Sequence, residues 1–175
     1  MGSKGAAMSL FTLVHVLISL IGIAAGFVVL YGMLTAKRLP GWTATFLAMT
    51  LLTSVTGFFF PFHKLMPSHI LGVISLVVLA IAIPARYIFH MAGPWRKTYV
   101  ITSMMAQYFN VFVLIAQAFQ KVPALKALAP TQSEPPFLMS QLVVMVIFIA
   151  LIIAAAIRFL PEPAAQAPPV AVPGM

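Results

Sequence analysis

Long apolar stretches separated by short polar connections dominate the chain. Five of them are long enough to cross a hydrocarbon core, which needs about 20 residues of helix. They cover residues 9–34, 44–62, 69–90, 98–119 and 137–160. An isolated strand would leave its backbone amides without partners in lipid, so each stretch is expected to be helical. The pattern predicts an all-α, polytopic integral membrane protein, a bundle of five transmembrane helices.

The connections between these stretches carry helix-breaking residues. Each contains proline or glycine, as in TAKRLPGWT and MAGPWRK. The first apolar stretch is much longer than the apolar core of a signal peptide, so we expect it to be a permanent helix. Residues 1–160 therefore form one transmembrane domain. Residues 161–175 are rich in proline and alanine, and we expect a disordered tail there.

The composition agrees with a lipid environment. Hydrophobic residues make up 62% of the chain and charged residues 7%, against roughly 45–50% and roughly 25% in soluble domains. The chain contains no cysteine, which excludes disulfides, thiolate nucleophiles and thiolate metal sites. The net charge of +8 is interpreted as a topology signal rather than as a nucleic-acid surface, because the basic residues lie at the ends of the apolar stretches.

The basic residues divide unequally between the two sides of the predicted bundle. Four lie on one side and six on the other, respectively Lys4, Lys64, Lys121 and Lys126, and Lys37, Arg38, Arg86, Arg96, Lys97 and Arg158. Cytoplasmic loops carry the excess of lysine and arginine, so the second side is expected to be cytoplasmic. The N-terminus would then lie outside and the C-terminus in the cytoplasm.

Acidic residues are nearly absent, which disfavours several function classes. The chain has two, Glu134 and Glu162, and both lie outside the apolar stretches. Proton-coupled transporters and membrane hydrolases commonly use buried carboxylates, so we expect no catalytic activity. Arg86 consequently has no counter-ion within its stretch. We expect it to reach toward lipid phosphates; in the alternative, Arg86 and His90 together hold an anionic ligand or a lipid headgroup.

The fourth stretch is the most polar. Its polar residues share one arc of the helix and therefore face the bundle: Ser103, Gln107, Asn110 and Gln117. We favour hydrogen bonding between helices as their role. The alternative is the lining of a polar cavity for water, a quinone or a small solute, which makes Gln107, Asn110 and Gln117 candidate ligand-binding residues.

The first stretch has a face of small residues. Gly22 and Gly26 form a G-x-x-x-G pair on the same stripe as His15. Such pairs let another helix approach closely, so we expect packing inside the bundle against Thr50, Ser54 and Gly57 of the second stretch. Formation of a homo-oligomer through Gly22 and Gly26 is the alternative.

Three histidines approach the same side of the bundle: His15, His63 and His69. Neutral imidazole binds haem iron, zinc or copper. A haem hypothesis pairs His15 with His69, and a metal hypothesis joins all three. We favour a structural or surface role for them, and hence a chain without a cofactor.

These observations favour a small multi-pass protein of the bacterial inner membrane that has no catalytic activity of its own. Its expected role is that of an accessory or assembly component of a membrane complex. One alternative is a redox module that binds haem b or a quinone, with His15 and His69 as ligands. Another is a small-solute channel or transporter, which requires a continuous polar path across the bundle.

Overall fold

The structure, a computed structural model, describes residues 3–60 and 67–159, with side chains from Leu10 to Phe60 and from Ile70 to Phe159. The described residues are helical and include no strand, which confirms the all-α prediction. The helices are α1 (Ser3–Leu34), α2 (Pro40–Gly57), α3 (Pro67–Tyr87), α4 (Pro94–Lys121), α5 (Pro123–Leu128) and α6 (Pro135–Arg158). The predicted tail, residues 161–175, and His63 lie outside the described residues.

Every helix after α1 begins at a proline. These prolines are Pro40, Pro67, Pro94, Pro123 and Pro135. Proline suits the first helical position, because its fixed φ fits the helix and the backbone N–H that it lacks would have no partner there. The helices therefore start a few residues before the apolar stretches from which they were predicted. The short helix α5, within the last connection, was not predicted.

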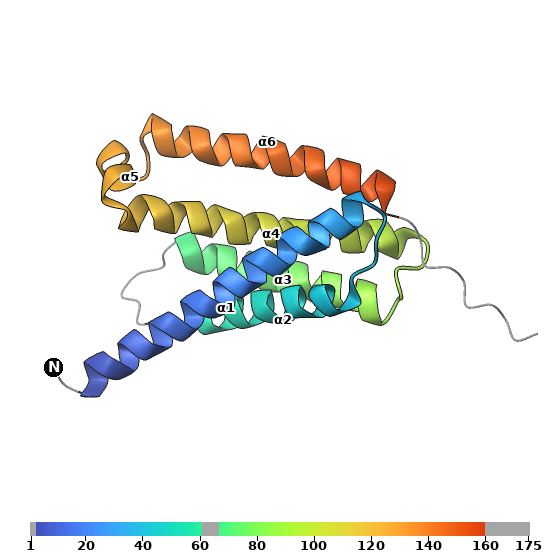
Figure 1. Cartoon of the computed structure of the whole chain (residues 1–175), viewed down its shortest axis with the longest axis horizontal. Coiled ribbons are helices and arrows are strands. Elements are labelled where there is room, and N and C mark those ends of the chain that lie inside the picture. The colour runs from blue at the N-terminus through green and yellow to red at the C-terminus, as the bar shows by residue number, and fades with distance from the viewer. Residues whose placement is uncertain (1–2, 61–66, 160–175) are drawn as a thin grey trace, which may run out of the picture.

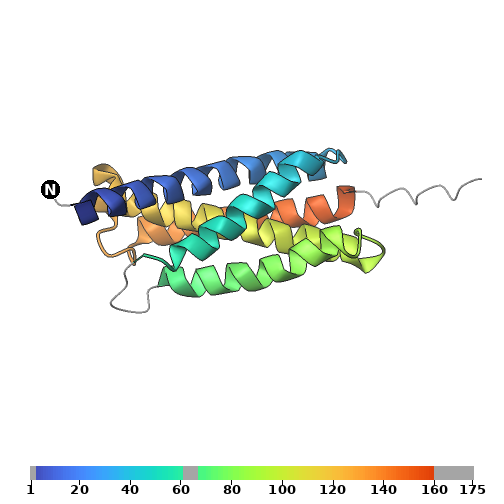
Figure 2. The ribbon, with the colours of Figure 1, turned by 90° about the horizontal axis from the view of Figure 1, so that it is seen from below.

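The five long helices run alternately between the two ends of an elongated bundle, with α5 beside the end of α4 (Figure 1). The view from below shows the same alternation (Figure 2). Helix α4 is central and contacts each of the other helices. We call the end with the α1–α2 connection, the α3–α4 connection and the end of α6 the basic end. Its basic residues are Lys37, Arg38, Arg86, Arg96, Lys97 and Arg158.

Within the described part of the chain, four helices are long and apolar enough to cross a membrane. They cover Leu10–Leu34, Ile70–Tyr87, Pro94–Lys121 and Pro135–Arg158. The prediction of a fifth span at residues 44–62 is wrong by this measure. Helix α2 ends at Gly57, before the phenylalanines at 58–60, and its threonines and serine lower its hydropathy. It nevertheless runs along the bundle beside α1 (Figures 1 and 2).

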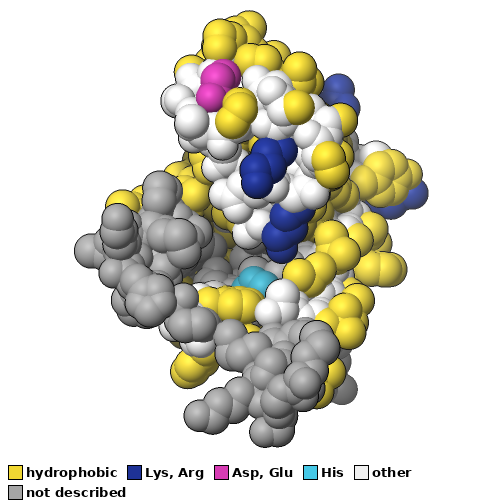
Figure 3. Space-filling view, turned by 90° about the vertical axis from the view of Figure 1, so that its left-hand side faces the viewer, with side chains coloured by type: hydrophobic (Ala, Val, Ile, Leu, Met, Phe, Trp, Pro, Cys, Tyr) yellow, Lys and Arg dark blue, Asp and Glu magenta, His cyan; other side chains and the backbone are white. Residues whose placement is uncertain are grey.

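Apolar side chains cover much of the outside of the bundle. On α6, for example, Leu142, Val146 and Ile153 are exposed, whereas Phe148 and Ala155 are buried. Seen from the end at which α1 begins, apolar side chains extend along the flanks, and charged ones lie on the upper part of this end (Figure 3). Apolar side chains on the outside of the bundle are suited to contact with lipid. Helices can lie in lipid because their backbone groups form hydrogen bonds within the helix.

Candidate functional site

Gln107, at the middle of α4, is a fully buried amide. It is 0% exposed, and its Nε2 donates to the backbone oxygen of Ile23 on α1 at 3.0 Å. Its Oε1 has no hydrogen-bond partner. This oxygen lies against Gly26, where a Cβ atom would overlap it. A Cα–H···O contact is the weak interaction that such proximity allows. The Gln107 amide is thus held against the backbone of α1 by its bond to Ile23 and its close contact with Gly26.

Other polar side chains link further pairs of helices. Asn110 Nδ2 donates to Thr50 Oγ1 at 3.0 Å, which joins α4 to α2. Gln141 Nε2 of α6 donates to the backbone oxygen of Phe112 at 3.1 Å. Helices α2 and α3 are joined by the Ser54–Ser75 hydroxyl pair at 3.2 Å. These amide N–H groups and hydroxyls are therefore engaged with neighbouring helices, which is the arrangement expected of structural hydrogen bonds.

Two other members of the predicted polar arc behave differently. Ser103 is buried but bonds within its own helix, to the oxygen of Tyr99 at 2.6 Å. Gln117 is exposed, so the prediction that it faces the bundle is wrong. It lies in the last turns of α4, where the short helix α5 follows. The four residues consequently do not line one continuous path.

The small-residue face of α1 packs against its own chain. Gly22 and Gly26 are buried, and a Cβ on Gly22 would lie 3.2 Å from Cβ of Met49 on α2. Gly26 faces Gln107 of α4. The predicted packing of the α1 and α2 faces is confirmed where Gly22 meets Thr50 and where His15 lies beside Gly57. Ser54 instead bonds to Ser75 of α3. Since both glycines are covered within one chain, a homo-oligomer through them would require these contacts to open.

His15 is half-buried between α1 and α2. Its Nδ1 lies 2.8 Å from Thr56 Oγ1, and its ring meets Phe60 edge-on with 5.0 Å between ring centres. His69 lies in the first turn of α3, but its side chain and all of His63 fall outside the described part of the chain. Among described side chains, no three histidine or acidic residues come together. The haem pair and the metal trio therefore stay predictions.

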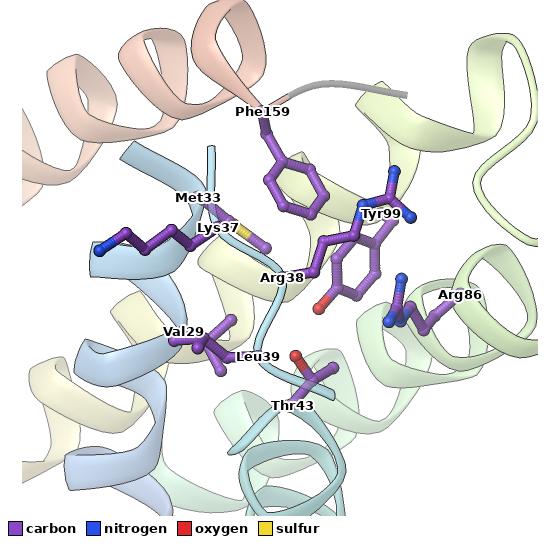
Figure 4. Close-up of a pocket in the computed structure, with 9 residues that line it drawn as sticks. All are labelled: Val29, Met33, Lys37, Arg38, Leu39, Thr43, Arg86, Tyr99 and Phe159. Carbon is purple, nitrogen blue, oxygen red and sulfur yellow. The ribbon is translucent and has the colours of Figure 1, made fainter. Parts of the chain in front are cut away.

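Arg86 lines a pocket at the basic end, and His90 does not. The residues that line the pocket come from α1, the α1–α2 connection, α2, α3, α4 and the end of α6 (Figure 4): Val29, Met33, Lys37, Arg38, Leu39, Thr43, Arg86, Tyr99 and Phe159. His90 instead has an exposed side chain and a φ of 47°, in the turn after α3. Arg86 is thus grouped with Arg38 and not with the residue predicted as its partner.

The end of α1 explains how Arg38 reaches this pocket. Ala36 adopts a left-handed φ of 54°, and the N–H of Lys37 donates to the oxygen of Gly32 at 2.7 Å. The N–H of Ala36 points to the oxygen of Met33 at 3.4 Å. These two bonds form a Schellman motif, which ends the helix and turns the chain sharply. A side chain on Gly32 would crowd Lys37 O and Leu39, so glycine lets the connection fold back here.

The pocket itself is small, aromatic and cationic. Its free volume is about 10 Å³, which is about what one water molecule needs. Cζ of Arg86 lies 5.9 Å from the ring centre of Tyr99, and Cζ of Arg38 lies 6.0 Å from that of Phe159. These two rings are 6.4 Å apart. Two guanidinium groups are therefore held on adjacent rings around a space of one oxygen atom.

The sequence points to Arg86 as a candidate binding residue, but not to Arg38 and Tyr99 as its neighbours. From the sequence alone, Arg38 is interpreted as a topology signal, since basic residues in connections have that role in most membrane proteins. Comparison of the chain with protein-family models, curated proteins and solved structures gave no match. The geometry described above is therefore the basis for any functional assignment.

Proposed function

We propose that this chain is a non-catalytic multi-pass membrane protein that acts as an accessory or assembly component of a larger membrane complex. The observation that carries the proposal is the engagement of the polar core. Gln107 is clamped onto α1, Asn110 bonds to α2, and Gln141 joins α6 to α4. Such a core supports a packed scaffold better than a solute path, which needs polar groups free to exchange partners.

We further propose the bacterial inner membrane as the location, with the basic end in the cytoplasm. The charge distribution supports this orientation. Among the described residues, the basic end carries six lysine and arginine residues, and the opposite end carries Lys4, Lys121 and Lys126. Excess positive charge is retained on the cytoplasmic side. The start of α1 would then lie outside and the end of α6 in the cytoplasm.

The test is to extract the protein directly into lipid nanodiscs and to measure its mass by light scattering and native mass spectrometry. We expect one assembly of constant stoichiometry that contains a second membrane protein. A lone chain in every preparation would contradict the proposal.

The same preparation separates the alternative functions. A Soret band in its visible spectrum, lost in His15→Ala, would indicate haem b, and extracted quinone would indicate a quinone site. Solute flux in liposomes that contain the chain alone would indicate a channel or transporter. We expect none of these signals from the nanodisc preparation that shows the assembly.

A further inference from the structure

The central helix α4 is open on one side. In Figure 1, α6 lies above α4 and α3 lies below it. Both helices pack on α4, and within the described part of the chain they form no packed interface with each other. Gln107 of α4 faces α1, and half-buried Met105 and Phe109 lie about 200° around the helix from it, at 100° per residue. The side of α4 that faces away from α1 is therefore accessible between α3 and α6.

This open side carries a pattern for packing against another helix. Its residues follow one another at alternating spacings of four and three positions: Thr98, Thr102, Met105, Phe109, Phe112 and Ala116. We call these residues the α4 seam, and all of them are half-buried. A repeat of 3.5 residues is the pattern by which two helices pack along each other, and it suits the left-handed crossing that is common in membrane bundles. The α4 seam therefore has the register to bind a further helix.

The α4 seam differs from the surface that α6 turns outward. The exposed residues of α6 include Leu142, Val146 and Ile153, which are branched aliphatic side chains suited to lipid. The α4 seam instead includes threonine and alanine, and such small residues let another helix approach closely. Helix α4 also has the lowest hydropathy of the four candidate spans. Its open side is therefore less suited to lipid than the outer face of α6.

Tyr108 borders the α4 seam at the middle of the membrane. Its ring packs on Phe109 and Phe112 of the seam and on Phe148 of α6, with ring centres 5.6, 6.2 and 5.7 Å away. At a rise of 1.5 Å per residue, Tyr108 is roughly 20 Å from either end of α4. Because the hydrocarbon core of a bilayer is about 30 Å thick, this residue lies near the centre of the bilayer.

The hydroxyl group of Tyr108 has no acceptor within the described part of the chain, where neither a hydrogen bond nor a charge acts on it. Hydrocarbon contains no acceptor, and a tyrosine hydroxyl that is removed from water usually has a partner. The other tyrosines lie in helical turns near the basic end, at the level where tyrosine is enriched: Tyr31, Tyr87 and Tyr99. Tyr108 is therefore suited to donate to an acceptor on a neighbouring molecule.

We propose that the α4 seam binds one transmembrane helix of the partner membrane protein, and that this helix presents an amide or hydroxyl oxygen to Tyr108. The partner helix lies along α4 between α3 and α6, in contact with Met105 and Phe109. An uncharged acceptor suits this depth, because the described lysine and arginine residues lie at the two ends of the bundle. The inference rests on the function proposed above, since it identifies the surface through which the chain joins its complex.

The first test is a competition for the partner inside cells. The unmodified chain and a variant, with tags of different mass, are expressed together, and native mass spectrometry of the nanodisc assembly measures their ratio. The ratio is divided by that of the two chains in the whole membrane, which corrects for folding and expression. Tyr108→Phe removes the hydroxyl and keeps the ring contacts, so it should enter the assembly about threefold less than the unmodified chain. Tyr87→Phe, at an exposed tyrosine of α3, should compete equally.

Added bulk on the α4 seam gives a larger effect. Thr102→Phe fills the space of the partner helix and should reduce entry into the assembly by about tenfold or more. Val146→Phe adds the same ring on the exposed face of α6, where Val146 is 56% exposed, and should leave entry unchanged. The Tyr108→Phe variant keeps the test decisive if Thr102→Phe does not fold.

The second test locates the partner helix directly. The photoreactive analogue benzoylphenylalanine replaces Phe109 in one chain and Phe27, an exposed phenylalanine of α1, in another. Illumination of the assembly should join position 109 to the membrane protein that the nanodisc measurement identifies. Position 27 should give no such product.

The contrary outcomes separate this inference from the proposed function. A lone chain in every nanodisc overturns both. An assembly that Tyr108→Phe and Thr102→Phe enter as well as the unmodified chain, with no product at position 109, retains the accessory function and overturns the docking surface. A product at position 109 between two copies of this chain would show that the α4 seam joins copies of the chain. Quinone that is extracted with the unmodified chain and lost in Tyr108→Phe, without a product at position 109, would show that a small ligand occupies the groove.

Discussion

At the scale of single residues, Gly26 shows how the absence of one side chain determines where two helices meet. Gln107 is fully buried because its amide occupies the space that a Cβ on Gly26 would fill. An alanine there would displace the amide and break its 3.0 Å bond to Ile23. The displaced amide would then remain buried without a partner, which costs more than the bond itself contributes.

We predict that Gly26→Ala destabilises the protein by about 1–2 kcal/mol. The measurement is thermal unfolding in detergent. Adding Gln107→Ala should recover part of the loss, because the two residues are in direct contact and their effects are not additive. Gly41→Ala is the control, since a Cβ at Gly41 would meet nothing within 4 Å. Equal stability of Gly26→Ala and the unmodified chain would contradict the close contact between the Gln107 amide and the backbone of α1 at Gly26.

A substitution of Ala36 should increase the stability of the protein, in contrast to the loss expected for Gly26→Ala. Its φ of 54° is unfavourable for a residue with a Cβ by roughly 1 kcal/mol, and glycine is the usual residue at this position of a Schellman motif. Ala36→Gly should therefore stabilise the protein by up to about 1 kcal/mol. The same unfolding assay measures this, with Ala92→Gly as a control in a second exposed connection. A lower unfolding midpoint for Ala36→Gly would contradict the motif.

At the scale of elements, α6 is held to the bundle by polar contacts near both of its ends. Gln141 bonds to the backbone of α4 at one end. At the other end Arg96 donates to the oxygens of Ala156 and Phe159. A cation at the C-terminus of a helix satisfies unpaired carbonyl groups and interacts favourably with the helix dipole. Between these contacts, Phe148 packs on Tyr108 with ring centres 5.7 Å apart.

We predict that Arg96→Gln releases the C-terminal end of α6. Hydrogen bonds to a charged donor contribute about 1.5–3 kcal/mol, so their loss should open this end measurably. An introduced cysteine in place of half-buried Ala156 reports the opening by its rate of reaction with a thiol reagent, since the chain has no other cysteine. Lys97→Gln, one residue further and exposed, should not change the rate. Equal rates in both variants would contradict this anchoring role.

The N-terminal end of α6 should respond to acid. Partial desolvation acts to raise the pKa of Glu134, but hydrogen bonds from Thr131 Oγ1, the N–H of Thr131 and the N–H of Ser133 outweigh it. The pKa is therefore below its ordinary value of 4.5. A lowered pKa in the folded state means that the contribution to stability is complete above pH 4.5 and is lost as the pH falls through the folded pKa.

Glu134→Gln provides the matching measurement. The difference in unfolding midpoint between this variant and the unmodified chain should be constant from pH 7 to pH 5 and should shrink below pH 4.5. Other acid-titrating groups are present in both proteins and cancel in the comparison. A difference that is the same at pH 3 as at pH 7 would show that the carboxylate charge does not stabilise the turn before α6.

The helix boundaries show what hydropathy alone can and cannot predict. The apolar runs identified all five long helices, but they placed the starts of α2 and α4 four residues late, at 44 and 98 instead of Pro40 and Pro94. The prolines at the first helical positions carried the missing information. Hydropathy also extended α2 through the phenylalanines at 58–60, whereas the helix ends at Gly57 because apolar character does not by itself keep a backbone helical.

At the scale of the whole molecule, the two ends of α4 should lie on opposite sides of the membrane. Lys97 lies at the basic end and Lys121 ends the helix, and both are exposed. With one cysteine introduced per chain, we predict that Lys121→Cys reacts with a membrane-impermeant reagent in intact cells. Lys97→Cys should react only after the membrane is opened, because the basic end faces the cytoplasm in our proposal. Reaction in the reverse order would invert that orientation.

The candidate site was less predictable than the fold for a physical reason. Membership of a bundle follows from periodic apolar positions within one segment, so it can be predicted locally. The pocket joins residues far apart in the sequence, such as Arg38, Arg86 and Phe159, and their meeting depends on how α1 ends and how α6 packs. The alternative grouping of Arg86 with His90 rests on proximity along the sequence alone, whereas His90 is exposed and its left-handed φ turns the chain there.

The unequal charge of the two ends gives the molecule a response to membrane voltage. Its basic end has six positive residues, and the opposite end has Lys4, Lys121, Lys126 and the negative Glu134 among the described residues. Moving one charge across a membrane costs about 2.3 kcal/mol per 100 mV. In an energised membrane that is negative inside, carrying the basic end outward would work against the field for each of its charges. With the basic end in the cytoplasm, as we propose, the voltage of a living cell would help to keep the bundle oriented, and this contribution would disappear when the membrane is depolarised.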